Sequence, residues 1–241
     1  ARQTLDLTLR LTQRSVSSEF KGTTLGRLWS FINPLATIAI FALIFGVVFR
    51  GGVEPGRNSG IDSFALWIGI GVLSWTFFSS GIMSSMNALV DNSGLLTKVY
   101  FPRQVLIYSA VLSLAVDFAF ELLVLVIIAM ILGGPGVLAM IPALLVVTVL
   151  VGMFAVGLGL MLSIATVYFR DLGHLWQIFN QMWMYASGVV FPLTMVNKVQ
   201  NDLFDKGWQV NGGPIPLTTI LRLNPAETDL EAFRSCLYDF A

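Results

Sequence analysis

The sequence predicts an all-α, polytopic helical membrane protein, from its composition and from its long uncharged runs. Hydrophobic residues make up 56% of the 241 residues and charged residues only 12%, whereas a soluble domain carries about 25% charged residues. The mean hydropathy is +0.79. Charged side chains are therefore too few to cover a water-soluble globule, which argues against an ordinary soluble enzyme.

The uncharged runs are long enough to cross a bilayer. Between Arg27 and Arg50 lie 22 uncharged residues, which at about 1.5 Å per residue reach about 33 Å and so span the hydrocarbon core. The longest apolar stretch contains Gly-Gly-Pro-Gly at residues 133–136, where we expect one helix to end and the next to begin. We expect five spans, at about residues 28–49, 64–86, 105–132, 138–165 and 174–196.

The distribution of Lys and Arg favours a cytoplasmic N-terminus. With that orientation the inner segments hold 8 of these residues and the outer segments hold 6, and cytoplasmic loops of membrane proteins are enriched in them. The N-terminal segment, residues 1–27, alternates leucines as a strand would. Its charges at Asp6, Arg10 and Arg14 nevertheless share one face of a helix. We expect an amphipathic helix at the membrane interface, with a poorly ordered tail as the alternative.

Two further segments lie between or after the spans. Residues 87–104 are expected in the cytoplasm and are too apolar for a plain solvated loop, which favours docking on a partner or on the membrane. Residues 197–241 are expected outside the membrane as short helices. One of these should begin at Asn224, a helix-capping residue followed by Pro225, and run towards Tyr238 at the membrane surface.

Two carboxylates, Asp117 and Glu121, lie inside the third span and on one helix face. Carboxylates in hydrocarbon are costly and normally face protein or water. They indicate either a substrate path or a structural polar contact between helices, and the sequence leaves both open. Two stripes of small residues predict close helix packing, namely Ala155, Gly159 and Ser163, and Thr76, Ser80 and Ser84.

The chain carries no recognisable catalytic or metal site. No Gly-Lys dipeptide is present, so the phosphate-binding loop of ATPases is missing and any ATP must bind another polypeptide. His174 lies near Arg170 and Asp171 at a predicted membrane boundary, where an ion cluster is the expected arrangement. The formal net charge is +0, which gives no indication of a nucleic-acid partner.

Several motifs occur in the order found in one transporter family. They are Leu25-Gly26-x-x-Trp29 with Asn33-Pro34, Trp75-x-Phe77-Phe78, LLTKVYFPR from Leu95 to Arg103, Tyr168-Phe169-Arg170-Asp171-Leu172, Phe191-Pro192, Asn224-Pro225 and Phe233-Arg234. Each motif alone is weak, but the ordered set extends over nearly the whole chain. The sequence resembles the permeases of ABC exporters for O-antigen, teichoic acid and related glycans.

The resemblance implies the type-2 ABC exporter permease fold, in a homodimer with two separate ABC ATPase subunits that bind ATP and Mg. The implied substrate is a polyprenyl-diphosphate-linked polysaccharide exported across the bacterial inner membrane among its lipids. The family has a sixth span, which we expect beyond Ala241.

The resemblance also implies residue roles. Coupling to the ATPase is expected at Leu89, Leu95, Leu96, Lys98, Val99, Tyr100, Phe101, Arg103, Arg170 and Asp171. Access of the lipid head group is expected at Arg10, Arg14, Lys21 and Arg27. The translocation path is expected at Trp67, Trp75, Phe77, Phe78, Asp117 and Glu121, although aromatic residues also form interfacial belts.

Other functions remain possible from the residues alone. A drug- or lipid-exporting ABC permease would share the spans. A proton-coupled carrier would use Asp117 and Glu121 directly and need no ATPase. An intramembrane enzyme is disfavoured because no nucleophile with its base is present, and a purely structural subunit is the remaining alternative.

Overall fold

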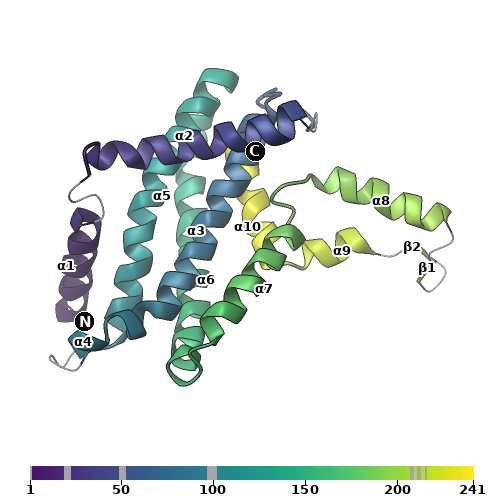
Figure 1. The fold of residues 1–241 in the computed structure, drawn as a ribbon. Coiled ribbons are helices and arrows are strands. Elements are labelled where there is room, and N and C mark those ends of the chain that lie inside the picture. The colour runs from purple at the N-terminus through teal and green to yellow at the C-terminus, as the bar shows by residue number, and fades with distance from the viewer. Residues whose placement is uncertain are drawn as a thin grey trace.

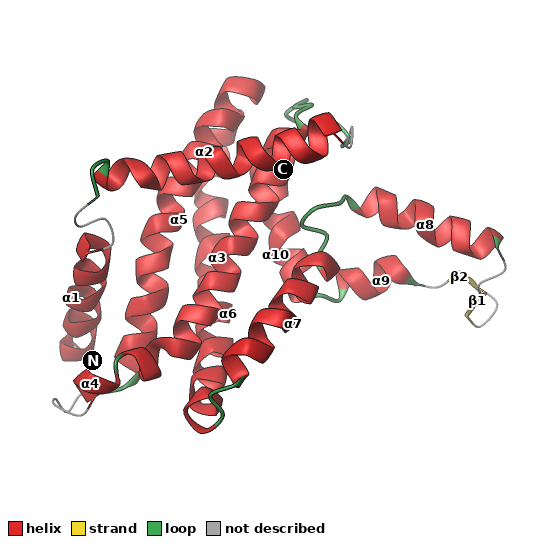
Figure 2. Ribbon diagram, viewed as in Figure 1, coloured by secondary structure: helices red, strands yellow, loops and turns green. Residues whose placement is uncertain are grey.

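A computed structural model describes residues 2–18, 23–48, 53–96, 102–206, 209–210, 213–214 and 216–241, and within these the chain is helical apart from one two-residue strand pair (Figures 1 and 2). The helices of the first half are α1 (Arg2–Ser18), η1 (Gly26–Leu28), α2 (Trp29–Phe41), η2 (Ala42–Val48), α3 (Phe64–Asp91), α4 (Ser93–Leu96) and α5 (Gln104–Gly133). The second half contains η3 (Pro135–Met140), α6 (Ile141–Tyr168), α7 (Leu172–Ala186), α8 (Leu193–Asp205), α9 (Leu217–Arg222), α10 (Pro225–Arg234) and η4 (Ser235–Asp239). Strands β1 (Gln209–Val210) and β2 (Gly213–Pro214) pair antiparallel between α8 and α9.

Four helical stretches among the described residues are long and apolar enough to cross a membrane. They are Gly26–Phe45, Phe64–Asp91, Gln104–Gly133 and Pro135–Tyr168. The all-α fold of a multi-pass membrane protein is therefore confirmed. The predicted break in the longest apolar stretch is also confirmed, because α5 ends at Gly133 and Gly134 adopts φ +85° before Pro135 starts η3.

Helix α3 is the centre of the molecule. It packs against α2, α5, α6, α7 and α10, and 78% of its most apolar window is buried. The corresponding windows of α5 and α6 are only 28% and 17% buried. Exposed apolar side chains such as Leu145, Val149 and Met153 on α6 form a surface suited to lipid or to another apolar chain.

The contact between α3 and α6 depends on small residues. Ala155, Gly159 and Ser163 are buried, so the predicted packing role of this stripe is confirmed. On α3, however, the close contacts are made by Gly81 with Ala155 and by Ser85 with Gly159. The predicted stripe of Thr76, Ser80 and Ser84 is displaced by one residue from this face, and Thr76 is exposed.

Helix α2 lies across α5 and α3 instead of alongside them (Figure 1). The Phe31 ring packs edge-on against Phe120 of α5 with centroids 5.5 Å apart. Further along, the Ile38 side chain packs at Gly69 of α3. The opposite side of α2 exposes apolar residues, including Leu35 and Ile40.

The fifth predicted span, 174–196, is not one continuous helix. Helix α7 has 15 residues and ends at Ala186, which at about 1.5 Å per residue is about 22 Å and shorter than the hydrocarbon core. Gly188 adopts φ +63°, a left-handed conformation that favours glycine, and Pro192 then precedes α8. Residues 187–192 therefore interrupt the helix that the apolar run predicts.

The C-terminal region also differs from its predicted place. The helix start at Asn224 is confirmed, since its side chain accepts a hydrogen bond from Ala226 N at 3.1 Å. The prediction of a helix lying on the surface is wrong, because α10 packs against α3 and α6 and buries Leu230 and Phe233. The Phe233 ring contacts Phe118 of α5 edge-on at 5.6 Å.

The substitution Gly159→Ala tests the contact between α3 and α6. An added Cβ would overlap the Ser85 side chain, and overpacking of this kind costs about 1–3 kcal/mol. We expect a lower midpoint of thermal unfolding in detergent. Gly157→Ala is the matched control on the same helix, because its Cβ would meet no atom within 4 Å, and an equal effect of both substitutions would contradict the packing role.

Candidate functional site

The predicted coupling residues that the structure describes lie at one end of the bundle. The C-terminus of α3, helix α4 and the start of α5 meet there, and the exposed turn with Arg170 and Asp171 between α6 and α7 lies at the same end (Figure 1). Gly173, just after that turn, lies beside Met86 of α3. The structure thus brings together the two segments that the sequence predicts to face the cytoplasm.

Within this coupling end, not all of the predicted residues can be placed. Lys98, Val99, Tyr100 and Phe101 lie outside the described residues, and the backbone of Leu95 and Leu96 lies in α4. Arg103 is exposed immediately before α5. Leu89 is half-buried and packs against the small cluster of Ala88, Leu106 and Ile107. It therefore contributes to the contact between this end of α3 and the start of α5.

The predicted helix at the N-terminus is confirmed as α1, which packs along α5. Thr12 is buried in this contact, whereas Leu5 and Leu9 are 61% and 50% exposed. Helix α1 therefore runs beside a candidate span, and its exposed leucines lie next to the exposed Arg10 and Arg14 (Figure 1).

Of the four residues predicted for head-group access, one lines a polar pocket and one lies outside the described residues. Arg14 contributes to a pocket of about 290 Å³ with Asp91, Asn92 and Ser109 at the coupling end. Arg10 and Arg27 are exposed. Lys21 lies outside the described residues.

The four aromatic residues predicted for the translocation path are all buried in this chain. Phe77 stacks on Phe118 with centroids 4.4 Å apart. Trp75 and Phe78 contact Trp183 of α7 at 6.1 and 5.3 Å. These rings fill the middle of the bundle around α3.

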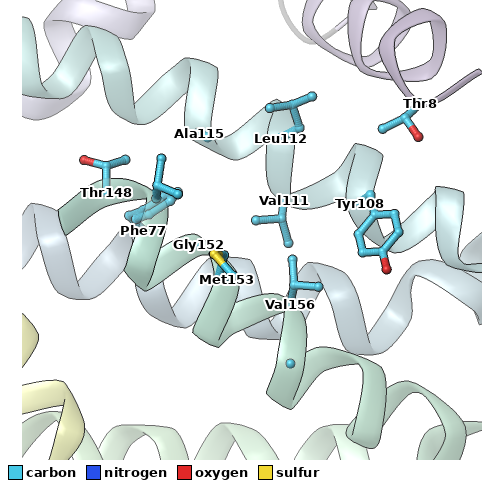
Figure 3. Close-up of a pocket in the computed structure, with 12 residues that line it drawn as sticks. Thr8, Phe77, Tyr108, Val111, Leu112, Ala115, Thr148, Gly152, Met153 and Val156 are labelled. Carbon is cyan, nitrogen blue, oxygen red and sulfur yellow. The ribbon is translucent and has the colours of Figure 1, made fainter. Parts of the chain in front are cut away.

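Phe77 also borders an apolar groove of about 520 Å³ between α1, α5 and α6 (Figure 3). The hydroxyl groups of Thr8, Tyr108 and Thr148 are the few polar groups in its walls. The carboxylates of Asp117 and Glu121 are half-buried on α5 and are not among the groove-lining residues.

A second polar pocket, of about 280 Å³, lies at the opposite end of α3 and was not predicted as a site. We call it the Arg234 pocket. Its polar side chains come from the loop before α3 and from α8, α9, α10 and η4, namely Glu54, Arg57, Asn197, Arg222, Glu231, Arg234 and Asp239. Trp67, a predicted path residue, also lines it.

Arg234 holds the wall of this pocket together. Its Nη2 donates to the carbonyl oxygens of Gly188 and Val189 at 3.2 and 3.0 Å, and its Nη1 donates to Glu231 at 3.1 Å. The guanidinium lies 3.6 Å above the Trp67 ring. Gly71, one turn further along α3, leaves room for this arrangement, because a Cβ there would meet Arg234 Nη2 at 2.8 Å.

Burial lowers the pKa of the Arg234 guanidinium to about 10, and the Glu231 carboxylate opposes this effect. The group therefore stays charged at neutral pH. The sequence offered Arg234 only as part of a family motif, because its role depends on contacts with residues more than forty positions away.

Asn224, at the start of α10, makes a second set of contacts with α7 and the residues after it. Its Oδ1 accepts from Trp183 Nε1 at 2.8 Å as well as from Ala226 N. Its Nδ2 donates to Ala186 O and Ser187 Oγ at 3.2 and 2.9 Å. All four hydrogen-bonding positions of this side chain are used, so it ties α10 to the end of α7.

The fold and these sites define a multi-pass helical membrane protein with polar pockets at both ends of its central helix. The sequence profile of the family described as ABC-2 type transporter matches residues 6–201. The chain belongs to the ABC-2 type transporter family. The resemblance found in the sequence motifs is thereby confirmed.

Named relatives agree with this assignment. The O-antigen export system permease protein RfbA of Myxococcus xanthus is 31% identical over 191 residues, which cover 79% of this chain and 70% of the relative. Two proteins of the same name from Klebsiella pneumoniae are each 24% identical over 191 residues, covering 79% of this chain and 71% of their own length.

Arg234→Met tests the role of this guanidinium in the structure. The substitution leaves the buried carbonyls of Gly188 and Val189 without a donor, and each such loss costs about 1–3 kcal/mol. We expect a lower thermal midpoint and faster proteolysis within residues 187–192. Arg170→Met, at an exposed arginine, is the control, and equal stability of the two variants would contradict the assignment.

Proposed function

We propose that this chain is the permease subunit of an ATP-driven exporter that moves a polyprenyl-diphosphate-linked polysaccharide out of the cytoplasm. The observation that carries the proposal is the 31% identity, over 79% of this chain, to a protein named as an O-antigen export permease. The ordered motifs and the helical fold support it. The proposed setting is the bacterial inner membrane, with the N-terminus in the cytoplasm.

The proposed assembly is a homodimer of this chain with two ABC ATPase subunits, which bind ATP and Mg. ATP binding closes the ATPase pair, and the motion enters this chain at residues 87–104 and at Arg170 and Asp171. The position of both segments at one end of the bundle supports this role. Because α3 is packed against five other helices, a displacement of its C-terminus moves the rest of the bundle.

The anionic head group of the lipid-linked substrate is proposed to approach near α1. Arg10 and Arg14 are cations beside the exposed leucines of α1, so the helix offers charge at the depth where lipid phosphates lie. The pocket that Arg14 shares with Asn92 and Ser109 supplies further polar groups. The aromatic residues around α3 are proposed to border the path of the sugar chain.

Co-purification in mild detergent tests the assembly. A tagged full-length chain should recover a stoichiometric ABC ATPase, and Lys98→Glu should reduce that recovery at least about tenfold, because it reverses a charge in the proposed docking segment. Lys198→Glu is the matched control at the other end of the bundle. Recovery of the chain alone, with transport intact and dependent on a proton gradient, would favour a carrier that uses Asp117 and Glu121.

Charge reversal in α1 tests the head-group role. The double variant Arg10→Glu and Arg14→Glu should reduce the surface polysaccharide of whole cells severalfold, while ATPase recovery stays normal, because two carboxylates repel the diphosphate. Lys206→Glu should leave export unchanged. Normal export by the double variant would remove these residues from the mechanism.

A further inference from the structure

The Arg234 pocket has a composition unlike a phosphate site. Three arginines, Arg57, Arg222 and Arg234, are balanced by three carboxylates, Glu54, Glu231 and Asp239, so the formal charge of the lining is zero. An anion would meet as many repelling carboxylates as attracting guanidiniums. A neutral ligand rich in hydroxyl groups meets no such penalty, because each hydroxyl both donates and accepts hydrogen bonds.

The segments that form the pocket are joined to one another by hydrogen bonds. Asp239 accepts a hydrogen bond from Arg57 N at 3.0 Å, and Tyr238 donates to the Glu54 carbonyl at 3.2 Å. Asn58 donates its backbone N–H to Asp239 O at 3.1 Å. These bonds join the loop before α3 to η4, and Arg234 joins α10 to the break after α7, so the segments that carry the polar groups are held together.

One buried donor in this wall has no partner. Arg234 is 4% exposed, and its Nε lies buried without a hydrogen-bond partner among the described residues. Unpaired buried donors are rare in folded proteins. Because this Nε has almost no accessible surface, a ligand in the pocket does not reach it, and Arg234 acts by holding the wall in place.

Size and position agree with one sugar ring. The volume of about 280 Å³ lies just below the roughly 300–1,000 Å³ of sites for drug-sized molecules, as expected for a ligand as small as one sugar ring. The pocket adjoins Trp67 in the first turn of α3, whereas the coupling segment begins at the last turn. Under the predicted orientation it faces the outside, where an exported glycan leaves the membrane.

Resting on the proposed function, we propose that the Arg234 pocket is an exit subsite that binds one uncharged monosaccharide unit of the polysaccharide. Asn197, Arg222, Glu54 and Glu231 supply hydrogen bonds to vicinal hydroxyl groups. Arg234 is a positioning residue that holds the pocket wall through its bonds to Gly188, Val189 and Glu231.

Saturation-transfer NMR on the complex with its ATPase in lipid nanodiscs tests the proposal. The probes are methyl glycosides of the common hexoses, deoxyhexoses and N-acetylhexosamines, with inorganic phosphate as competitor. At least one glycoside should bind at millimolar concentration. Asn197→Ala and Arg222→Met should each weaken this binding about tenfold, as expected for the loss of a hydrogen bond to the ligand.

Lys198→Ala is the matched control, because Lys198 is the exposed neighbour of Asn197 on α8 and does not line the pocket. It should bind as the wild type does. Absence of binding by every glycoside, unchanged binding by both pocket variants, or displacement of the glycoside by phosphate would each overturn the proposal.

Export of polysaccharide to the cell surface, measured with the same complex, separates this proposal from the proposed function. Export without glycoside binding would contradict the exit subsite and leave the proposed function standing. Absence of export by an intact complex with the ATPase would contradict the proposed function, whatever the pocket binds.

Discussion

The close approach of helices to α3 is the constraint on which the rest of the structure depends. A helix packed against five others must offer its neighbours a surface without bulky side chains, and Gly69, Gly71, Gly81 and Ser85 supply it. Ile38 of α2 packs at Gly69, Arg234 of α10 at Gly71, and α6 at Gly81 and Ser85. Each of these contacts brings a different part of the chain to the same helix, so substitutions on α3 affect regions that are distant in sequence.

The contact at Gly71 has the largest functional consequence. A break in an apolar helix exposes carbonyl groups that water cannot reach inside a bundle, and such groups must find donors. Here Arg234 and Asn224 supply them, both from α10 or its cap. The break after α7, the inward position of α10 and the pocket lined by Arg234 are therefore one arrangement.

The elements that depend on local sequence could be predicted, whereas those that depend on distant partners could not. Uncharged runs predicted the long helices, Gly134 and Pro135 predicted the end of α5, and Asn224 predicted the start of α10. The break after α7 also has a local signal, Gly188 and Pro192, inside the long uncharged run. The donors that satisfy its carbonyls could not be predicted, because they come from residues about 40 positions downstream. The stripe on α3 was displaced by one residue, which rotates the expected face by about 100°, because small residues are frequent on both sides of that helix. Among the candidate sites, the coupling residues are assigned from the family motifs and stay a prediction, whereas the Arg234 pocket has no sequence signal because its polar side chains come from five separate segments.

The positions of the polar and apolar regions limit the routes by which a hydrophilic polymer could cross this apolar bundle. Polar pockets lie at the two ends of α3, which at 28 residues and about 1.5 Å per residue is about 42 Å long. Between these pockets, Phe77 and Phe78 stack on Phe118 and Phe154, and Trp75 and Phe78 meet the Trp183 ring edge-on. A closed aromatic core of this kind offers no continuous row of hydroxyl-binding groups. The sugar chain would then have to cross where this core opens or along the exposed faces of α2, α5 and α6, which a second copy could cover. In the first case the contacts of Trp75 and Phe78 with Trp183 must separate during transport; in the second they stay closed and the groove beside Phe77 becomes part of the path.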